Sequence, residues 1–148
     1  MSVSPKTSDL AATMPCPETG RMLTRGVRPF AVRYKGREMT VDLPGYYPEG
    51  EGESVHVGDD MAAADEALRI LKEEVDGVPT PATIRRIRNK LRLSQRAAGT
   101  LFRVGPSAFD KYERAIVEPS GPTIQLLKLL DRHPELAGEL ERSTGDRR

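Results

Sequence analysis

The segment Leu93–Glu113, which reads LSQRAAGTLFRVGPSAFDKYE, decides the fold of the C-terminal half of the chain. Ser94 can cap a helix, because its hydroxyl can accept a free N–H of the first turn. The small residues Ala97–Gly99 would then let a second helix pack closely. Gly105 can take a left-handed backbone, and Pro106 suits the first turn of a following helix. The segment therefore predicts two short helices joined by a tight turn, the layout of a helix-turn-helix.

The second of these helices should have one apolar and one polar side. Phe109 and Tyr112 fall on the apolar side and are expected in the core. Ser107, Lys111 and Arg114 fall on the outer side. In a helix-turn-helix the second helix enters the DNA major groove, where its outer residues meet base edges. The polar side is therefore a candidate DNA-reading surface, although Lys111 could also be an ordinary solvated lysine.

Charge is distributed unevenly between the two halves of the chain. Residues 1–76 contain 9 Lys/Arg and 14 Asp/Glu, a balance of −5. Residues 77–148 contain 14 Lys/Arg and 8 Asp/Glu, a balance of +6, so the net charge of +1 hides two halves of opposite sign. Nine basic residues lie between Arg85 and Arg114, against only two acidic ones. Together with the helix-turn-helix pattern, this charge predicts double-stranded DNA as a partner.

The composition limits the class of protein. A chain of 148 residues with 37% hydrophobic and 5% aromatic residues can form one domain, or two with small cores. The single cysteine, Cys16, excludes an internal disulfide and favours a reducing compartment. No run approaches the roughly 20 apolar residues of a membrane span, and the N-terminus lacks a signal-peptide core. These features predict a cytoplasmic protein that is not bound to a membrane.

The N-terminal half shows a two-residue period that is typical of strands. Residues 1–15 are expected to form a flexible tail, and Lys35-Gly36 is a candidate turn. Ser54–Val57 is a candidate third strand. The apolar residues that alternate with polar ones around the turn are Phe30, Val32, Tyr34, Met39, Val41 and Leu43. The pattern predicts a β-hairpin.

Helical spacing replaces this pattern from Asp59 to Val75, where the apolar residues expected on one face are Met61, Ala64, Leu68, Leu71 and Val75. A Gly- and Pro-rich break follows, and we place a domain boundary there. We therefore predict an N-terminal domain at 16–76, a C-terminal domain at 77–142 and a flexible tail at 143–148. The expected class is α+β, with a small β-hairpin/α domain joined to an all-α domain of five helices.

The C-terminal half resembles the XRE (Cro-type) DNA-binding domains. The residues that carry this resemblance are Leu93-Ser-Gln, Ala98, Leu101, Phe102 and Phe109-Asp-Lys-Tyr-Glu-Arg. The stretch Pro122–Leu136 resembles the end of the MqsA (YgiT-type) antitoxins. Met14–Gly20 and Gly45–Glu51 stand where those antitoxins have their first and second Cys-x-x-Cys pairs. The resemblance covers the chain from about Pro15 to Leu140.

This resemblance implies a structural zinc, but the ligand positions have changed. The four positions read Cys16, Thr19, Pro48 and Glu51, and structural zinc needs four N or S donors, mostly thiolates. We therefore expect no metal and no other cofactor. A rescue site made of Cys16, Glu51 and His56 is the alternative.

The resemblance also implies roles for residues of the helix-turn-helix. Ser107 and Lys111 stand at the base-reading positions, and their spacing of four keeps them on one helix face. Arg96, Arg103 and Arg114 are expected to bind phosphates, which set register but carry little sequence information. The predicted DNA-binding set is completed by Ser94 and Gln95.

Taken together, these features predict the antitoxin of a type II toxin–antitoxin pair. The C-terminal domain would bind the operator of its own operon as a homodimer and repress it, with Leu126, Leu129 and Leu140 as candidate interface residues. The acidic N-terminal domain would neutralise a cognate toxin, implied by the resemblance to be an mRNA-cleaving ribonuclease. The candidate toxin contacts are Tyr34, Val41 and Tyr46.

Three other classes of protein are alternatives to an antitoxin. The first is a stand-alone XRE-family repressor whose N-terminal domain senses a ligand or mediates assembly. The second is a protein-interaction adaptor with a vestigial helix-turn-helix. An enzyme is not expected, because His56 and His133 lie in different halves and neither has a recognised catalytic spacing to a Cys or Ser.

Overall fold

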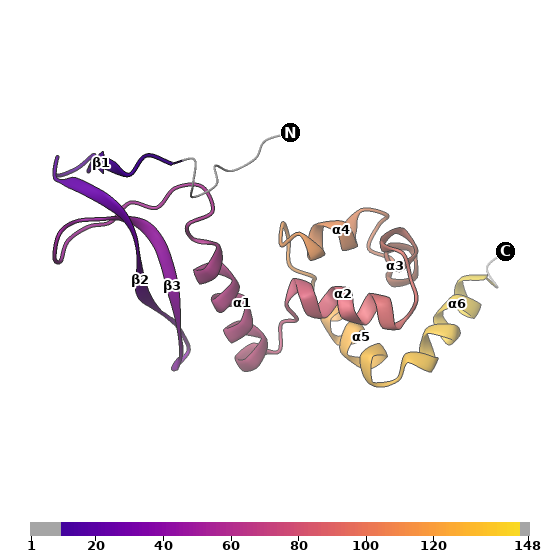
Figure 1. Ribbon diagram of the computed structural model, residues 1–148. Coiled ribbons are helices and arrows are strands. Elements are labelled where there is room, and N and C mark those ends of the chain that lie inside the picture. The colour runs from indigo at the N-terminus through magenta and orange to yellow at the C-terminus, as the bar shows by residue number, and fades with distance from the viewer. Residues whose placement is uncertain (1–9, 146–148) are drawn as a thin grey trace. The chain divides into compact units, whose positions relative to one another are not determined.

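The computed structural model describes residues 10–145 and divides into two compact units, Met1–Asp76 and Gly77–Arg148 (Figure 1). The N-terminal unit contains a three-stranded antiparallel sheet and one helix, whereas the C-terminal unit is helical. The protein is therefore of the α+β class, as predicted. Within the described residues, no helix is long and apolar enough to cross a membrane.

The sheet has the strand order β1-β2-β3. The short β1 (Thr13–Pro15) pairs with the start of β2 (Met22–Tyr34), and β2 pairs along most of its length with β3 (Arg37–Tyr47). Lys35 and Gly36 have positive φ angles of 46° and 84°, as a two-residue hairpin turn requires. The predicted hairpin is therefore present and is turned by the residues that the sequence indicated.

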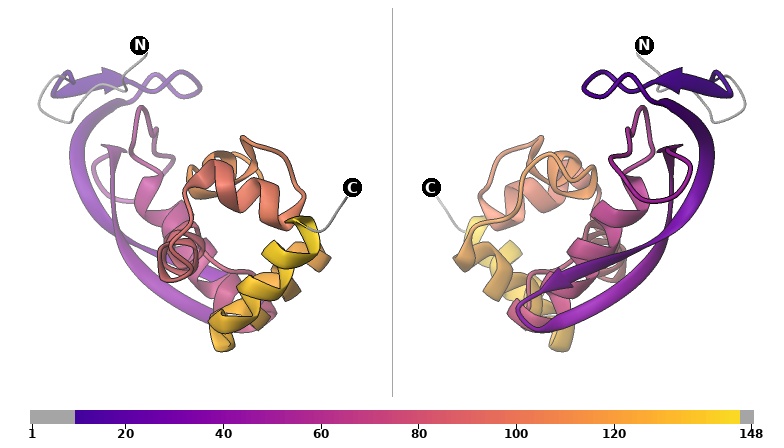
Figure 2. Two further views of the ribbon diagram at one scale, coloured as in Figure 1. Left: turned by 90° about the vertical axis from the view of Figure 1, so that its right-hand side faces the viewer. Right: turned by 90° about the vertical axis from the view of Figure 1, so that its left-hand side faces the viewer.

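One end of the hairpin packs against a helix. Near the turn, Val32 and Leu43 are buried with Ala67 and Leu71 of α1 (Ala62–Asp76). These side chains share one face of the sheet, because side chains alternate between faces along a strand. Figure 2 shows β2 and β3 twisting strongly past α1.

The other end of the hairpin buries the opposite face. Leu23 of β2 and Tyr46 of β3 pack with Cys16, and Val55 and Val57 lie against them. The pairing register of β2 and β3 is unbroken, so these side chains point away from the face that α1 covers. The N-terminal unit therefore has two small cores on opposite faces of one twisted hairpin.

Two elements of this unit differ from the sequence prediction. Ser54–Val57 does not form a strand and makes only the single bridge Tyr46↔Val55. Met61 and Val75 are exposed, and Ala67 is buried instead. The buried face of α1 is narrower than predicted, because only its central turns meet the hairpin.

Side-chain caps begin two helices of the C-terminal unit, and one of them is the predicted cap Ser94. Its elements are α2 (Pro81–Lys90), α3 (Gln95–Phe102), α4 (Ala108–Glu113), α5 (Gly121–Arg132), a 3-10 turn (Pro134–Leu136) and α6 (Ala137–Gly145). The Thr80 hydroxyl accepts the N–H of Thr83 at 3.1 Å, and the Ser94 hydroxyl accepts that of Ala97 at 3.0 Å. These side-chain caps fix where α2 and α3 start.

Phe109 forms the centre of the core of this unit. Its side chain is fully buried, and its ring meets those of Phe102 and Tyr112 edge-on at centroid distances of 5.1 and 5.3 Å. Ile84 and Leu127 pack on the same cluster. The prediction that Phe109 and Tyr112 are core residues is confirmed.

Gly99 lets α3 approach the turn that follows it. A Cβ atom at Gly99 would lie 2.0 Å from the carbonyl oxygen of Gly105, so no other residue fits. Gly105 has the positive φ predicted for it, and Arg103 also adopts a left-handed backbone, with φ 58°, where it ends α3. The close packing of α3 and α4 thus depends on one glycine in the helix and two left-handed residues after it.

Parts of both predicted tails belong to ordered elements. Thr13–Pro15 was assigned to the N-terminal tail, but it forms β1 by pairing with β2. Ser143–Gly145 was assigned to the C-terminal tail, but it continues α6. The rest of the tail predictions, residues 1–9 and 146–148, falls outside the described residues.

Asp131 joins α5 to α2. Its carboxylate accepts two hydrogen bonds from Arg86, each of 3.0 Å, and one from Lys90 at 3.0 Å. The hydrogen bonds from Arg86, with a further contribution from Lys90, lower the pKa of Asp131 to about 2. Ionised Asp131 therefore stabilises the packing of the two helices.

We expect acid to weaken this contact. Because the pKa of Asp131 is lower in the folded state, its contribution is present above about pH 4 and is lost as the pH falls toward 2. Denaturant unfolding between pH 5 and pH 2 measures this loss. Asp131→Asn should be less stable at pH 5 and should show a shallower decline than the wild type. An equal slope in both proteins would contradict the assignment.

Candidate functional site

A buried carboxylate, Glu113 of α4, connects three helices of the C-terminal unit. Its side chain has no exposed area, and it accepts hydrogen bonds from Arg88 at 2.7 and 2.9 Å. Arg85 and Gln95 donate to it as well, each at 3.2 Å. Burial alone would raise the pKa of Glu113, but the hydrogen bonds from Arg88, Arg85 and Gln95 outweigh burial and lower it. The ionised carboxylate thereby fixes α2, α3 and α4 relative to one another.

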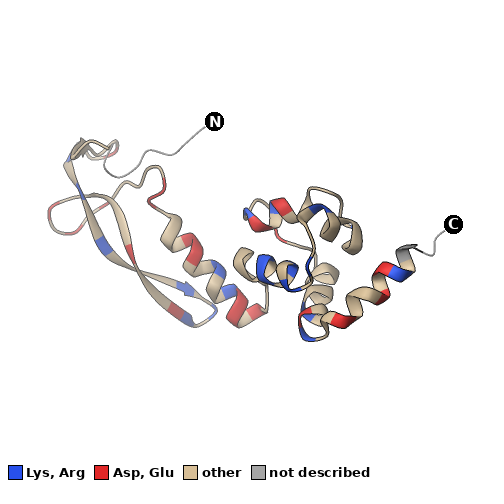
Figure 3. Ribbon diagram, turned by 45° about the vertical axis from the view of Figure 1, so that its right-hand side comes forward, with Lys and Arg blue, Asp and Glu red and all other residues tan. Residues whose placement is uncertain are grey.

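The surface around α3 and α4 is basic, and neither acidic residue of this segment is unpaired. The sequence places two acidic residues, Asp110 and Glu113, among nine basic ones. Glu113 is internal, and Asp110 is paired with Arg114 at 3.3 Å. Figure 3 shows Lys and Arg residues along α2 and, more sparsely, over the rest of this unit. Glu113 is buried together with most of its partner Arg88, so the exposed surface keeps the basic excess that the residue count indicates.

Four of the predicted DNA-binding residues are exposed and available to a ligand. Arg96, Arg103 and Lys111 are exposed, and their side chains make no hydrogen bond or ion pair with any described residue. Ser107 precedes α4, and its hydroxyl makes no capping hydrogen bond. These side chains come from α3, the turn and α4, so the fold brings them to one part of the unit.

The other three predicted residues have structural contacts of their own. The Ser94 hydroxyl caps α3, and the Gln95 amide donates to Glu113. Arg114 is exposed, but its guanidinium is shared with Asp110. Ser94 and Gln95 therefore position α3, whereas Arg96, Arg103, Ser107 and Lys111 are free to contact a partner.

In the N-terminal unit, two arginines hold the loop Pro48–Glu51 through its backbone. Arg28 donates to the carbonyl oxygens of Pro48, at 2.6 Å, and Gly50, at 3.0 Å. Arg21 donates to the carbonyl oxygens of Glu49, at 2.9 Å, and Glu51, at 3.3 Å. Arg28 also lies over the ring of Tyr47, 4.6 Å from its centroid. Four consecutive carbonyls are thus bound by two side chains of the hairpin and of the turn before it.

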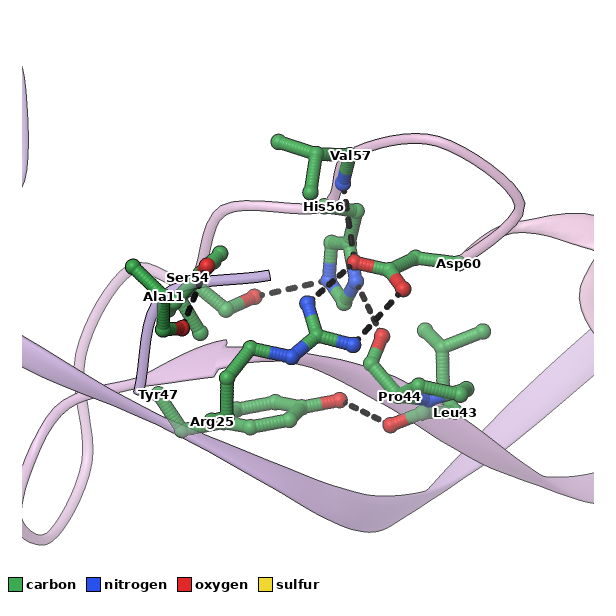
Figure 4. Close-up of polar contacts among 10 residues, drawn as sticks. Ala11, Arg25, Leu43, Pro44, Tyr47, Ser54, His56, Val57 and Asp60 are labelled. Carbon is green, nitrogen blue, oxygen red and sulfur yellow. Dashed lines mark hydrogen bonds and ion pairs between the residues drawn. The ribbon is translucent and has the colours of Figure 1, made fainter. Parts of the chain in front are cut away.

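A second arginine contact ties β2 to the segment before α1. Arg25 donates to both carboxylate oxygens of Asp60, at 2.8 and 2.9 Å, and both side chains are largely buried (Figure 4). Asp60 also accepts the N–H of Val57 at 2.8 Å. The hydrogen bond from Arg25 is the main cause of the lowered pKa of Asp60. This ion pair closes the polar side of the core around Tyr46, whose ring lies under Arg25.

The three predicted toxin contacts lie on both faces of the sheet, with Tyr34 and Val41 on the face that α1 covers and Tyr46 on the opposite one. Tyr34 and Val41 are half-buried beside α1, and the Tyr34 hydroxyl donates to Asp76. Tyr46 is buried, and its hydroxyl donates to the carbonyl of Ala11 at 2.7 Å. Of the three, Tyr34 and Val41 keep part of their surface accessible.

Comparison with known proteins identifies the family of this chain. Residues 14–141 match the family described as "Antitoxin component of bacterial toxin-antitoxin system, MqsA". The chain belongs to the MqsA antitoxin family. It is 30% identical over 131 residues to "Antitoxin MqsA" of Escherichia coli (strain K12), and the alignment covers 86% of this chain and 99% of the relative. The resemblance drawn from the sequence is confirmed at the level of the family.

The zinc site implied for MqsA antitoxins does not fit the residues of this chain. Cys16 is buried beside Leu23, and Pro48 has no donor atom. Both ring nitrogens of His56 are engaged, Nδ1 with the Pro44 carbonyl at 2.8 Å and Nε2 with the Ser54 hydroxyl at 3.0 Å. No group of three or more His, Cys, Asp or Glu residues in the described part of the chain could hold an ion. The rescue site is therefore not assembled.

No sequence pattern of this MqsA-family chain indicates the residues that organise both units. Glu113 and Arg88 lie 25 residues apart, and charged side chains of their type are usually exposed. Arg21 and Arg28 bind backbone carbonyls, which leave no side-chain pattern to detect. The one available signal was the absence of zinc ligands, because a loop without its metal needs another cross-link.

We expect the arginines to be more important than metal for the N-terminal unit. The full-length double variant Arg21→Gln/Arg28→Gln should melt several degrees lower, because four loop carbonyls lose charged donors. Arg33→Gln, which removes an exposed arginine of the same strand, should melt close to the wild type. A chelator should leave all three melting temperatures unchanged. One zinc per chain by elemental analysis, or chelator-induced melting, would contradict this view.

Proposed function

We propose that this protein neutralises a cognate toxin through its N-terminal unit and represses its own operon through its C-terminal unit. Family membership supports the role of antitoxin. The observation that carries the second activity is the exposed, unpaired set Arg96, Arg103 and Lys111 around a buried Glu113. The mRNA-interferase character of the toxin is implied by the family resemblance.

In this proposal α3 and α4 act as a helix-turn-helix of the XRE type. The short α4 enters the major groove, and Ser107 and Lys111 meet base edges there. Arg96 and Arg103 bind phosphates and set the register, with Arg114 at the end of α4. Ser94 and Gln95 hold the start of α3 at the backbone of the DNA. The fixed packing of α3 against α4 supports this role, since base reading needs side chains at defined positions.

A homodimer would double the length of DNA that is read. One helix-turn-helix contacts few base pairs, and two related by a twofold axis read a palindrome. Of the candidate interface residues, Leu129 is 45% exposed, whereas Leu126 and Leu140 are half-buried against the core. Leu129 is therefore the most available of the three for contact with a second copy.

The N-terminal unit is the proposed partner for the toxin. Its balance of −5 favours a basic protein, and RNA-binding toxins tend to be basic. Binding would mask the active surface of the toxin or hold it in an inactive arrangement. The opposite charges of the two units support a division of labour, with one unit for the toxin and the other for DNA.

Lys111→Ala should weaken binding to the protein's own promoter by about 1–3 kcal/mol, because it removes a base contact. The same change should affect random DNA much less. Lys128→Ala, which removes a lysine from α5, serves as the control and should bind like the wild type. Gel shifts at several salt concentrations measure these affinities. Equal affinity of the wild type for promoter and random DNA would contradict repression.

Neutralisation is tested by co-expression with the small basic protein expected from the adjacent reading frame. That protein alone should arrest growth, and the full-length chain should relieve the arrest. Lys111→Ala should relieve it as well, because the toxin would bind the other unit. If the neighbouring frame is harmless alone, the chain is better explained as a stand-alone repressor. If Lys111→Ala fails to neutralise, the division between the units is wrong.

A further inference from the structure

One face of the hairpin is exposed in the half that contains the Lys35-Gly36 turn. Helix α1 covers the face that carries Val32 and Leu43, as Figure 1 shows. The residues that alternate with these point the other way, and we name them the outer face: Val27, Pro29, Ala31, Thr40 and Asp42. Val27 is 60% exposed, and only Ala31 of the five is half-buried. The outer face is therefore accessible in the described part of the chain.

The composition of the outer face is unusual for a surface that meets only water. An antiparallel sheet with one solvated face normally alternates apolar and polar residues. On β2, however, Val27, Pro29 and Ala31 are apolar on the outer face, while Phe30 and Val32 are apolar on the inner one. A strand that is apolar on both faces is typical of a sheet covered on both sides. This pattern indicates that a partner covers the outer face.

The backbone of β2 also offers hydrogen-bonding groups along this edge. The N–H of Arg25 donates to the carbonyl of Ala12 at 2.8 Å, away from β3. In an antiparallel strand every second residue points its N–H to the same side, so Val27, Ala31 and Arg33 do so as well. Among the described residues no strand pairs with β2 beyond this point. An extended segment can therefore add to the edge.

The charge near the outer face and the proline on the edge of β2 limit the kind of partner that can bind there. Glu38 and Asp42 are exposed acids of the adjacent β3, and the unit as a whole is acidic. Pro29 removes one N–H from the edge, which disfavours pairing with arbitrary strands and with further copies of this chain. A partner that is extended, basic and partly apolar satisfies both conditions.

We propose that an extended basic segment of the cognate toxin pairs with the edge of β2 and covers the outer face. This inference rests on the proposed function, because it assumes that a toxin binds the N-terminal unit. It moves the contact from Tyr34 and Val41 to the residues that alternate with them. A shift of one residue along a strand changes the face, so the outer face is a different surface from the one that holds Tyr34 and Val41.

The test uses the full-length chain and the basic protein encoded beside it. Val27→Glu/Ala31→Glu should bind that protein roughly 30-fold more weakly or worse, as expected when central apolar contacts are lost. Val75→Glu changes an exposed apolar residue of α1 and should bind like the wild type. Titration calorimetry gives the affinities, and circular dichroism checks that the variants fold.

Hydrogen exchange on the unsubstituted chain gives a second readout that does not depend on folding of the variants. The amides of Val27, Ala31 and Arg33, which face the free edge, should become protected when the basic protein binds. Equal affinity of the double variant and the wild type would contradict binding at the outer face. Protection of Val27, Ala31 and Arg33 already present in the free chain would contradict a free edge. If the wild type does not bind the basic protein at all, the proposed function fails instead.

Discussion

The C-terminal unit depends on the buried ion pair between Glu113 and Arg88. Breaking such a pair by removing one partner typically costs about 3–5 kcal/mol, because the other charge stays buried and unpaired. The same carboxylate orders Gln95 at the start of α3 and stands at the end of α4. One internal contact therefore sets the geometry of both helices and leaves the neighbouring arginines facing solvent. Gly99 completes this arrangement by letting the turn between the helices approach α3.

The stability of the N-terminal unit is limited by its size, because a hairpin and one helix bury little apolar surface. Its two small cores lie on opposite faces of the twisted sheet, and arginines add cross-links to them. Arg25 pairs with Asp60 over one core, and Arg21 and Arg28 bind the loop that follows β3. Guanidinium groups suit this task, since each presents several donors in a fixed plane. This explains how the unit forms cross-links with residues that cannot hold zinc.

Local signals made much of the fold predictable. The caps Thr80 and Ser94, the turn Lys35-Gly36 and the core side of α4 follow from residue types at fixed spacings. The long-range contacts were not predictable, because nothing near Glu113 in the sequence shows that it is buried. For the candidate site, the sequence named the exposed arginines and Lys111. It did not distinguish residues that face a partner from residues such as Gln95 that support the surface.

The geometry of α3 and α4 depends on Glu113, and the direct measurement is operator preference in the Glu113→Gln variant. An amide of the same size keeps the shape of the side chain but places donors against Arg88. We predict a lower melting temperature and loss of the preference for the protein's own promoter over scrambled DNA, with neutralisation of the toxin retained. Wild-type melting together with wild-type promoter preference in this variant would contradict the account.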